Sequence, residues 1–174
     1  MKLTEQNEIY DLFRRAEDGD TDAMVRLGDY YEDNRQDVLS YAWFKRASVA
    51  GDPYGTLEAA RHVVNYYSEI SPEEVRAILE KAANIDMNDI PERDWDPVFT
   101  PGHAEANLSG MAFDHFLKHT GETWALLDNI KWLRRLVKRD EDEVFDHIEK
   151  ADCLEELEQA EQIARWLKID TTDA

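Results

Sequence analysis

Small side chains recur at steps of three or four residues in the stretch AEDGDTDAMVRLGDYY, residues 16–31, and they constrain how this chain can fold. Ala16, Gly19, Ala23 and Leu27, at steps of three or four, lead up to Gly28 along one helical stripe. A glycine inside a helix costs about 1 kcal/mol relative to alanine, so we expect Gly28 to mark a close approach of another helix. The stripe therefore predicts a tightly packed helix pair.

Apolar residues recur with a helical period along most of the remaining chain, and no segment alternates at the period of two that strands require. Ser71, Pro72 and Glu74 form a capping-box signature for one helix start. We expect an all-α fold whose first helices span residues 4–16, 21–34, 36–51, 53–68 and 71–85. The third of these helices carries around one face Val38, Tyr41, Ala42, Lys45 and Val49.

An internal repeat becomes visible when the expected helices are overlaid. Gly19-Asp20 aligns with Gly51-Asp52, a shift of 32 residues. The same shift places Ala23 on Gly55, Leu27 on Ala59, and Gly28 on Ala60. The second helices align Ala42 with Ala77, Phe44 with Leu79, and Ala47 with Ala82. Each unit is predicted to be helix, turn, helix, and stacked units would bury a continuous seam of small residues.

The first unit follows the pattern Gly-x3-Ala-x3-Leu-Gly-x2-Tyr, and its second helix ends at Gly51. The pattern residues are Gly19, Ala23, Leu27, Gly28, Tyr31, Ala42, Phe44, Ala47 and Gly51. Over residues 15–85 this resembles the Sel-1-like repeat, a relative of the tetratricopeptide repeat. The second unit departs from the pattern, with Ala59, Ala60 and Val63 in place of its Leu, Gly and Tyr. The resemblance implies an α/α superhelix that binds other proteins and has no catalytic residues.

The whole chain, residues 1–174, is predicted to be one domain of two to three helix-turn-helix units with a C-terminal helical cap. Residues 4–85 hold the repeat units, 86–102 an acidic loop rich in proline, 103–138 a candidate degenerate third unit, and 139–170 a C-terminal hairpin. In the candidate third unit the small stripe would continue through Gly102, Ala106 and Gly110. The core face expected of the hairpin is Val144, Phe145, Ile148, Leu154, Leu157, Ile163 and Leu167.

The charge of the chain narrows the range of partners. Lys and Arg number 20 against 39 Asp and Glu, which gives a net charge of −19. Nucleic acid and anionic membrane surfaces are disfavoured because their phosphates would be repelled. The start of the chain lacks the apolar run of a secretory signal, and no window approaches 18 apolar residues, so we expect a cytoplasmic protein.

Acidic residues concentrate near the C-terminus. From Asp140 to Glu161 there are 11 acidic residues and one basic residue. This segment could attract a basic partner through Glu155, Glu156 and Glu158. Alternatively, it is a solvated helix face that pairs with the preceding basic residues Lys131, Arg134, Arg135, Lys138 and Arg139.

The loop of residues 86–102 is the second candidate binding site. It is long for a segment without helical periodicity, and such loops are often functional. Trp95, flanked by Asp94 and Asp96 and followed by Phe99, could anchor a partner, because aromatic residues dominate binding hot spots. Alternatively, Trp95 folds back over the edge of the core.

Enzymatic chemistry has weaker support. His115 and His119 are spaced to share one helix face and could bind a divalent metal, but no third ligand or general base accompanies them. Cys153, the single cysteine, lies among carboxylates that raise a thiol pKa. No phosphate-binding glycine loop or nucleophile elbow is present. We therefore expect no enzyme activity, no cofactor and no small-molecule substrate.

These features favour a non-catalytic protein-interaction module. The leading hypothesis is an acidic inhibitor or immunity protein that neutralises a basic protein such as a nuclease toxin. The alternative is a regulatory adaptor or scaffold of the helical-repeat class, for which the acidity would serve only solubility. A metal-dependent enzyme is the third hypothesis.

Overall fold

The computed structural model describes residues 3–65, 70–90, 98–139 and 150–174. Throughout these residues the regular structure is helical and contains no strand, which confirms the predicted all-α class. No helix within them is long and apolar enough to cross a membrane. Contacts divide the chain into two compact units, Met1–Phe99 and Thr100–Ala174, hereafter the N-terminal and C-terminal units.

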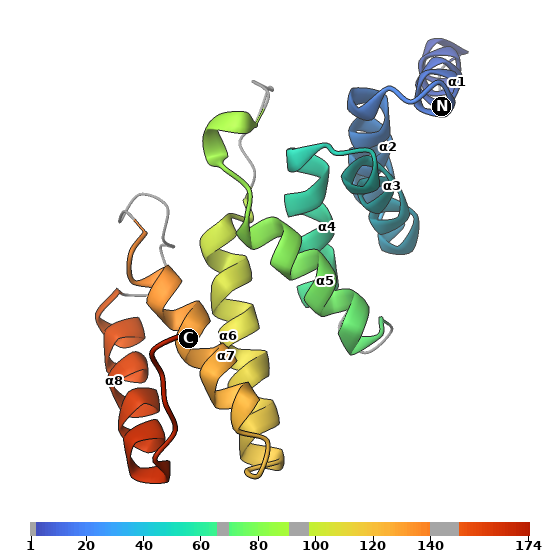
Figure 1. Cartoon of the computed structure of the whole chain (residues 1–174). Coiled ribbons are helices and arrows are strands. Elements are labelled where there is room, and N and C mark those ends of the chain that lie inside the picture. The colour runs from blue at the N-terminus through green and yellow to red at the C-terminus, as the bar shows by residue number, and fades with distance from the viewer. Residues whose placement is uncertain (1–2, 66–69, 91–97, 140–149) are drawn as a thin grey trace. The chain divides into compact units, whose positions relative to one another are not determined.

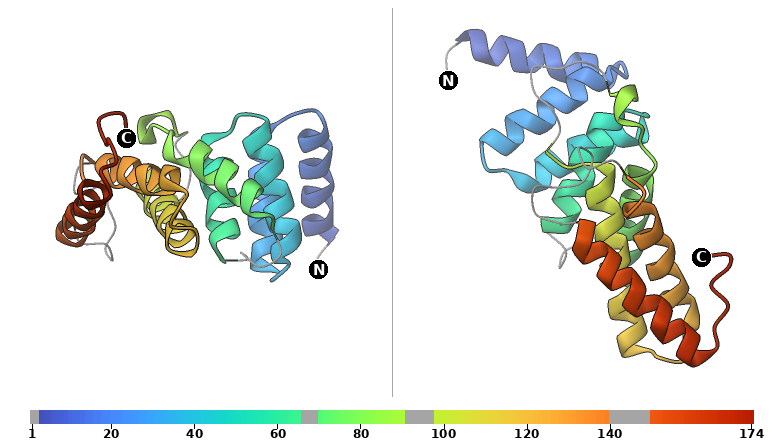
Figure 2. Two further views of the ribbon diagram at one scale, coloured as in Figure 1. Left: turned by 60° about the horizontal axis from the view of Figure 1, so that its bottom comes forward. Right: turned by 90° about the vertical axis from the view of Figure 1, so that its left-hand side faces the viewer.

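The described part of the N-terminal unit consists of helices joined by short turns (Figures 1 and 2). They are α1 (Leu3–Glu17), α2 (Thr21–Asp33), α3 (Asp37–Val49), α4 (Pro53–Asn65), α5 (Pro72–Ala83) and the 3-10 helix η1 (Met87–Asp89). Each α-helix packs against the next along the chain, the pattern expected of a helical repeat. The predicted capping of α5 is confirmed, because the Glu74 backbone N–H donates to Ser71 Oγ at 3.2 Å.

The repeated Gly-Asp pair ends one helix in the same way at two places. Gly19 and Gly51 have φ angles of +94° and +96°, a left-handed conformation that glycine adopts without steric cost. The backbone N–H groups of Asp20 and Asp52 then donate to the carbonyl oxygen five residues earlier, each at 3.0 Å. These bonds satisfy carbonyl groups that the helix end would otherwise leave unpaired.

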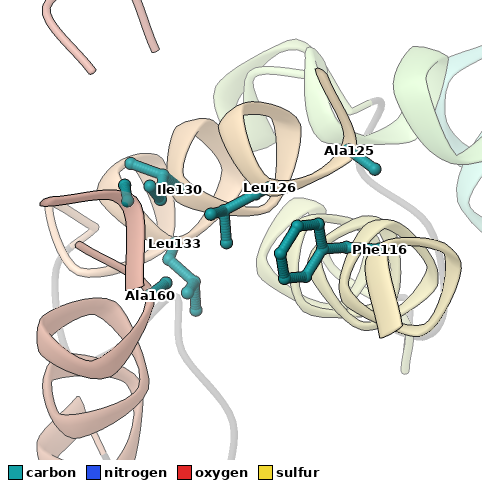
Figure 3. Close-up of a cluster of buried hydrophobic side chains, with 7 residues drawn as sticks. Phe116, Ala125, Leu126, Ile130, Leu133 and Ala160 are labelled. Atoms are coloured by element: carbon teal, nitrogen blue, oxygen red, sulfur yellow. The ribbon is translucent and has the colours of Figure 1, made fainter. Parts of the chain in front are cut away.

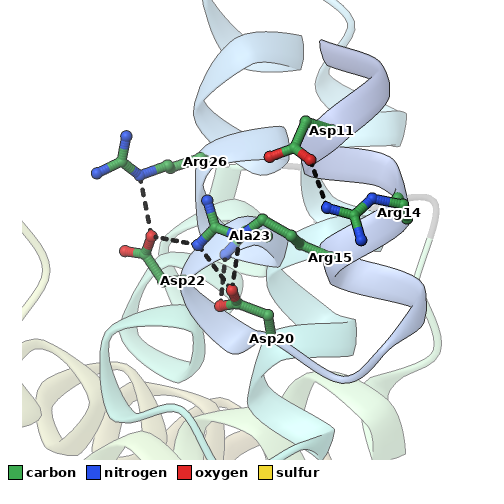
Figure 4. Close-up of polar contacts among 7 residues, drawn as sticks. All are labelled: Asp11, Arg14, Arg15, Asp20, Asp22, Ala23 and Arg26. Atoms are coloured by element: carbon green, nitrogen blue, oxygen red, sulfur yellow. Dashed lines mark hydrogen bonds and ion pairs between the residues drawn. The ribbon is translucent and has the colours of Figure 1, made fainter. Parts of the chain in front are cut away.

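The two aspartates also begin the following helices. Asp20 accepts a hydrogen bond from the Ala23 backbone N–H at 3.1 Å, and Asp52 accepts one from the Gly55 N–H at 2.8 Å. Arg15 additionally donates to Asp20 at 2.8 Å (Figure 4). The shift of 32 residues read from the sequence therefore corresponds to a repeated turn, with glycine closing one helix and aspartate opening the next.

The side chain of Phe44 explains why Gly28 lies inside a helix. Phe44, on α3, is fully buried, and a Cβ atom placed on Gly28 would lie 2.5 Å from its ring. On the α4 side, a Cβ atom on Gly55 would lie 2.5 Å from Ala47 Cβ. The His62 ring, also on α4, is 5.4 Å from the Phe44 ring. The two glycines thus let α3 pack closely between α2 and α4, as the small stripe predicted.

Burial follows the alignment of the two units. Of the aligned pairs, five are buried in both units, Gly19 with Gly51 and Ala42 with Ala77 are exposed in both, and only Asp20 and Asp52 differ, with Asp20 half-buried and Asp52 buried. The buried pairs are Ala23 with Gly55, Leu27 with Ala59, Gly28 with Ala60, Phe44 with Leu79, and Ala47 with Ala82. The repeat is therefore a repeat of packing environments as well as of residue types.

The inward face of α3 differs from the apolar face read from the sequence. Val38 and Val49 are 72% and 79% exposed, whereas Tyr41 and Lys45 are half-buried and both donate to Glu74 of α5 at 2.6 Å, so that face lies partly in solvent and partly against α5. The buried face consists of Ser40, Phe44, Ala47 and Ser48. The Phe44 ring fills the space left by Gly28, and the other inward positions of α3 are small or polar, with Ala47 lying directly against Gly55 of α4.

The described part of the C-terminal unit contains α6 (Pro101–Lys118), α7 (Thr123–Leu136) and α8 (Lys150–Leu167). Helix α7 packs against both α6 and α8. Its residues Leu126, Ile130 and Leu133 contribute to a core that also includes Phe116 and Ala160 (Figure 3). Residues 103–138 thus form a helical hairpin, as the candidate third unit requires.

Two expected faces in this unit are wrong in detail. On α6, Gly110 is exposed and no atom lies within 4 Å of a Cβ placed on it, so the small stripe does not continue as a packed seam. The buried residues of α6 include instead Ala104, Leu108, Ala112 and Phe116.

On α8, Leu154 and Leu167 are 51% and 38% exposed rather than in the core. The buried positions are Cys153, Ala160 and Ala164, whereas the expected core residues Leu157 and Ile163 are partly buried against the cluster. The other expected core residues of the hairpin, Val144, Phe145 and Ile148, lie outside the described residues.

Gly28→Leu should destabilise the protein by about 1 to 3 kcal/mol, because the added side chain would overlap the buried Phe44 ring. Gly110→Leu is the matched control: it adds the same side chain to a helix where the Cβ position is open. We expect its free energy of unfolding to stay the same or rise. Denaturant unfolding measures both variants, and equal stability of Gly28→Leu and the parent protein would contradict the packing argument.

Candidate protein-binding sites

The proposed anchor residues of the proline-rich loop are only partly covered by the structure. Asp94, Trp95 and Asp96 lie outside the described residues. Phe99 is described, and its side chain is buried, with 4% of its surface exposed. In this state Phe99 offers almost no surface to a partner.

The three proposed acidic residues near the C-terminus share one helix. Glu155, Glu156 and Glu158 are all exposed on α8. The structure therefore leaves all three carboxylates accessible to a basic partner. Together they form an acidic face, which we call the α8 face.

The basic residues before α8 pair in two directions. Arg134 donates to Glu161 of α8 at 2.8 Å, in line with the pairing alternative. Arg139 donates to both carboxylate oxygens of Glu105 on α6, at 2.7 and 2.9 Å, and Arg135 lies 3.0 Å from the same carboxylate. Glu105 is 1% exposed, so these two arginines compensate a buried charge.

A second acidic surface, which the sequence analysis missed, lies between α2 and α4. Residues of both helices and Val98 line a groove of about 450 Å³. Its lining residues are Asp29, Glu32, Asp33, Tyr54, Glu58, Arg61 and Val98. Four carboxylates thus surround one guanidinium in what we call the acidic groove.

The guanidinium of Arg61 is already engaged by two of these carboxylates. Its Nη2 donates to both oxygens of Glu32 at 2.6 Å, and its Nε donates to Glu58 at 2.7 Å. Burial raises the pKa of Glu58, whose side chain is only 5% exposed, and the charge of Arg61 opposes that shift. Arg61 therefore serves mainly to hold a buried carboxylate in its charged form.

Arg61 pairs with two of the four carboxylates that line the groove. Asp29 and Asp33 add two further carboxylates on α2, and Asp33 is exposed. Tyr54 and Val98 supply apolar surface beside them. A cationic side chain of a partner protein could place its stem against the apolar surface and its charge near the carboxylates.

The α2 residues of the groove had a signal in the sequence. Asp29, Glu32 and Asp33 are spaced three and four residues apart, so they share one helix face. Glu58 and Arg61 are likewise three residues apart on α4. The spacing alone does not show that α2 and α4 lie side by side, and it is this arrangement that brings both charged faces to one groove.

The surroundings of His115 and of Cys153 bear on the metal-binding and thiol chemistry considered from the sequence. His115 lies 2.8 Å from a carboxylate oxygen of Glu122, and its ring stacks near those of His119 and Trp124. Among the described residues, no group of three His, Cys, Asp or Glu side chains could hold a metal ion. Burial and nearby carboxylates raise the pKa of the Cys153 thiol, which disfavours a reactive thiolate.

The fold and the acidic surfaces together describe an all-α helical-repeat chain that presents carboxylates in a groove and on a helix face. Comparisons with protein-family models, with curated proteins and with solved structures find no match to this chain. The likeness to Sel-1-like repeats over residues 15–85 therefore stays a prediction from the sequence pattern.

Replacing Arg61 should reveal the buried charge of Glu58. Arg61→Met leaves that carboxylate without its cation, and we expect a loss of about 3 to 5 kcal/mol in the free energy of unfolding at neutral pH. Without Arg61 the raised pKa of Glu58 rises further, so the loss should shrink at low pH, where Glu58 is protonated, and grow as pH rises through that pKa.

The matched control is Arg26→Met on α2, where Arg26 pairs with Asp22 at 3.0 Å but is 55% exposed. Its cost should be at most about 1 kcal/mol. Denaturant unfolding at several pH values measures both variants. If the loss of unfolding free energy in Arg61→Met did not depend on pH, it would not come from the charge of Glu58 that the variant leaves without a cation.

Proposed function

We propose that this chain is a non-catalytic binding protein for a basic protein partner, and that it acts as an inhibitor by covering the partner's cationic surface. An immunity protein that neutralises a basic nuclease toxin is the specific form of this proposal. The observation that carries it is the acidic groove between α2 and α4, where four carboxylates line the surface around Arg61 and two of them already engage it.

The proposal rests physically on the carboxylates of the acidic groove and on their pairing with Arg61. Arg61 donates to Glu32 and Glu58, and Asp33 adds an exposed carboxylate at the rim of the groove. A partner lysine or arginine near these carboxylates would gain favourable electrostatic energy, whereas phosphate would be repelled. An acidic surface of this kind can occupy the cationic cleft in which a nuclease holds the phosphates of its substrate.

The net charge of the chain would assist the approach of such a partner. At −19, the chain produces a field that speeds encounter with a cationic surface, and salt screens that field. The three exposed glutamates of the α8 face add to the attraction. The acidity therefore acts mainly on the rate of association and on the choice of partner.

An adaptor function is the second candidate, and the outer face of α3 favours it. Val38 and Val49 are largely exposed there, on the side of the helix opposite the packed seam. Scattered apolar residues are common on surfaces, but two on one helix face could contact a second protein. An adaptor would bind partners without regard to their charge, which separates it from the inhibitor.

Affinity capture with this chain as bait, at low and at moderate salt, tests the proposal. A single basic protein that is retained at moderate salt, and whose activity falls when the chain is added, would support inhibition. Several partners of neutral charge, retained equally at both salt concentrations, would support the adaptor and refute the inhibitor.

Charge reversal on the α8 face should slow association with the captured basic partner. For the triple variant Glu155→Lys, Glu156→Lys, Glu158→Lys we expect an association rate about tenfold lower and a flatter salt dependence, because the attractive field is weakened. The charge-matched control reverses Glu8, Glu17 and Asp18, which are exposed at the first helix and its end. Stopped-flow association measures all three proteins, and equal rates for both triple variants would show that the α8 face has no special part.

Reversing one charge in the acidic groove tests the site on which the proposed function rests. Asp33→Lys places a cation on the exposed rim of the acidic groove without touching the Arg61 pairs. We expect dissociation of the partner to become faster, with a loss of affinity of about tenfold, because the partner's cation would then face a like charge. Unchanged affinity would place the partner elsewhere on the chain.

A further inference from the structure

A cleft in the C-terminal unit has chemistry of its own. Residues of α6, α7 and α8 line a hollow of about 260 Å³. Phe113, Leu133 and Ala160 provide its apolar surface, and Asp114 and Glu156 provide exposed carboxylates. The cleft is smaller than the roughly 300 to 1,000 Å³ typical of small-molecule sites, so its size suits a single side chain better than a cofactor.

The side chain of Asn129 leaves an acceptor unused at this cleft. Asn129 lines the cleft and is 4% exposed. Its Nδ2 donates to the hydroxyl of Ser109 at 2.9 Å and to the Ser109 carbonyl oxygen at 3.2 Å, which fixes the orientation of the amide. Its Oδ1 is buried and accepts no hydrogen bond from any described residue. An acceptor left unpaired in this way is unfavourable, and a bound donor that reached it would recover that cost.

The open surface beside Gly110 makes the cleft accessible. Gly110 is exposed, lines the cleft, and has no atom within 4 Å of the place where a Cβ would stand. At Gly28, by contrast, the missing side chain is replaced by the Phe44 ring. Gly110 therefore leaves space that no packing contact of the described chain uses.

We propose that this cleft is a socket for an arginine side chain of the basic protein partner. The aliphatic stem and the guanidinium plane would lie against the half-buried Phe113, one N–H would donate to Asn129 Oδ1, and Asp114 and Glu156 would face the positive charge. This inference rests on the proposed function for the identity of the partner, but recognition of arginine by the cleft can be measured without that partner.

Arginine fits the cleft better than lysine for two physical reasons. A guanidinium has five donors in a fixed plane, so it can serve a buried amide oxygen and rim carboxylates at the same time. It is also less strongly hydrated than an ammonium group and stacks on aromatic rings such as Phe113. A lysine ammonium would lose more hydration for fewer simultaneous hydrogen bonds.

A capped tripeptide with arginine between two glycines is the probe, and its citrulline counterpart is the control, because citrulline has nearly the same shape without the charge. In a titration followed by amide chemical shifts, we expect saturable changes confined to residues 109–114, 129–133 and 156–160. The dissociation constant should be about millimolar, as few contacts are made. The citrulline peptide should bind about tenfold more weakly or not at all.

Gly110→Leu should abolish binding of the tripeptide, because the new side chain would occupy the cleft while the helix stays folded. Gly110→Ala controls for helix propensity and should bind nearly as the parent protein does. Glu156→Gln should weaken binding about two- to fivefold. Asp152→Asn, which removes an exposed charge of α8 outside both the cleft lining and the α8 face, should leave it unchanged.

The same variants separate this inference from the proposed function. If shift changes spread over all acidic surfaces and survive Gly110→Leu, the attraction is general and the socket is wrong. If the basic partner binds Gly110→Leu as tightly as the parent protein, the socket is likewise wrong although the proposed function stands. If the tripeptide binds in the cleft but the chain inhibits no basic protein, the proposed function fails. The preference of the cleft for arginine then remains supported.

Discussion

The contact of the Phe44 ring with Gly28 is the constraint on which the N-terminal unit depends. Because α2 has no side chain at that position and α4 has none at Gly55, α3 packs closely between them. This spacing decides where the other faces of α2 and α4 lie. Asp29 directly follows Gly28, and Glu58 lies three residues after Gly55, so the acidic groove is positioned by the same close packing. Core and candidate binding site are thus consequences of one steric requirement.

Three arginines of the described chain have the same role, because they compensate buried glutamates. Arg61 engages Glu58 in the N-terminal unit, and Arg135 and Arg139 engage Glu105 in the C-terminal unit. A buried carboxylate without such a partner would be strongly unfavourable. Cations used in this way do little to neutralise the exterior. The outward-facing charge is therefore more acidic than an even spread of the 20 basic residues would give.

The sequence predicted what is determined locally. The helix starts at Thr21 and Ser71 rest on residues a few places apart, and the structure confirms them, together with a shared burial at most positions aligned by the 32-residue shift. It failed where the inward face is made of small or polar residues, as on α3 and α8, because apolar periodicity then points to the wrong side. The acidic groove was missed for a different reason: its two halves lie on separate helices, each of which looks like an ordinary solvated face. The open position at Gly110 could not be told from the packed one at Gly28, since both are glycines inside helices.

The Gly-Asp turn has a consequence for how such a chain can change in length. Its left-handed glycine, its backbone bond to the residue five places earlier and its aspartate cap all lie within about ten residues, so the turn does not depend on distant parts of the molecule. A duplicated segment of 32 residues would carry its own start and stop signals and would need only a matching seam from its neighbour. Insertion or loss of one such segment would lengthen or shorten the stack by one whole repeat. The length of the molecule could therefore change in evolution without any change in the turns between its helices.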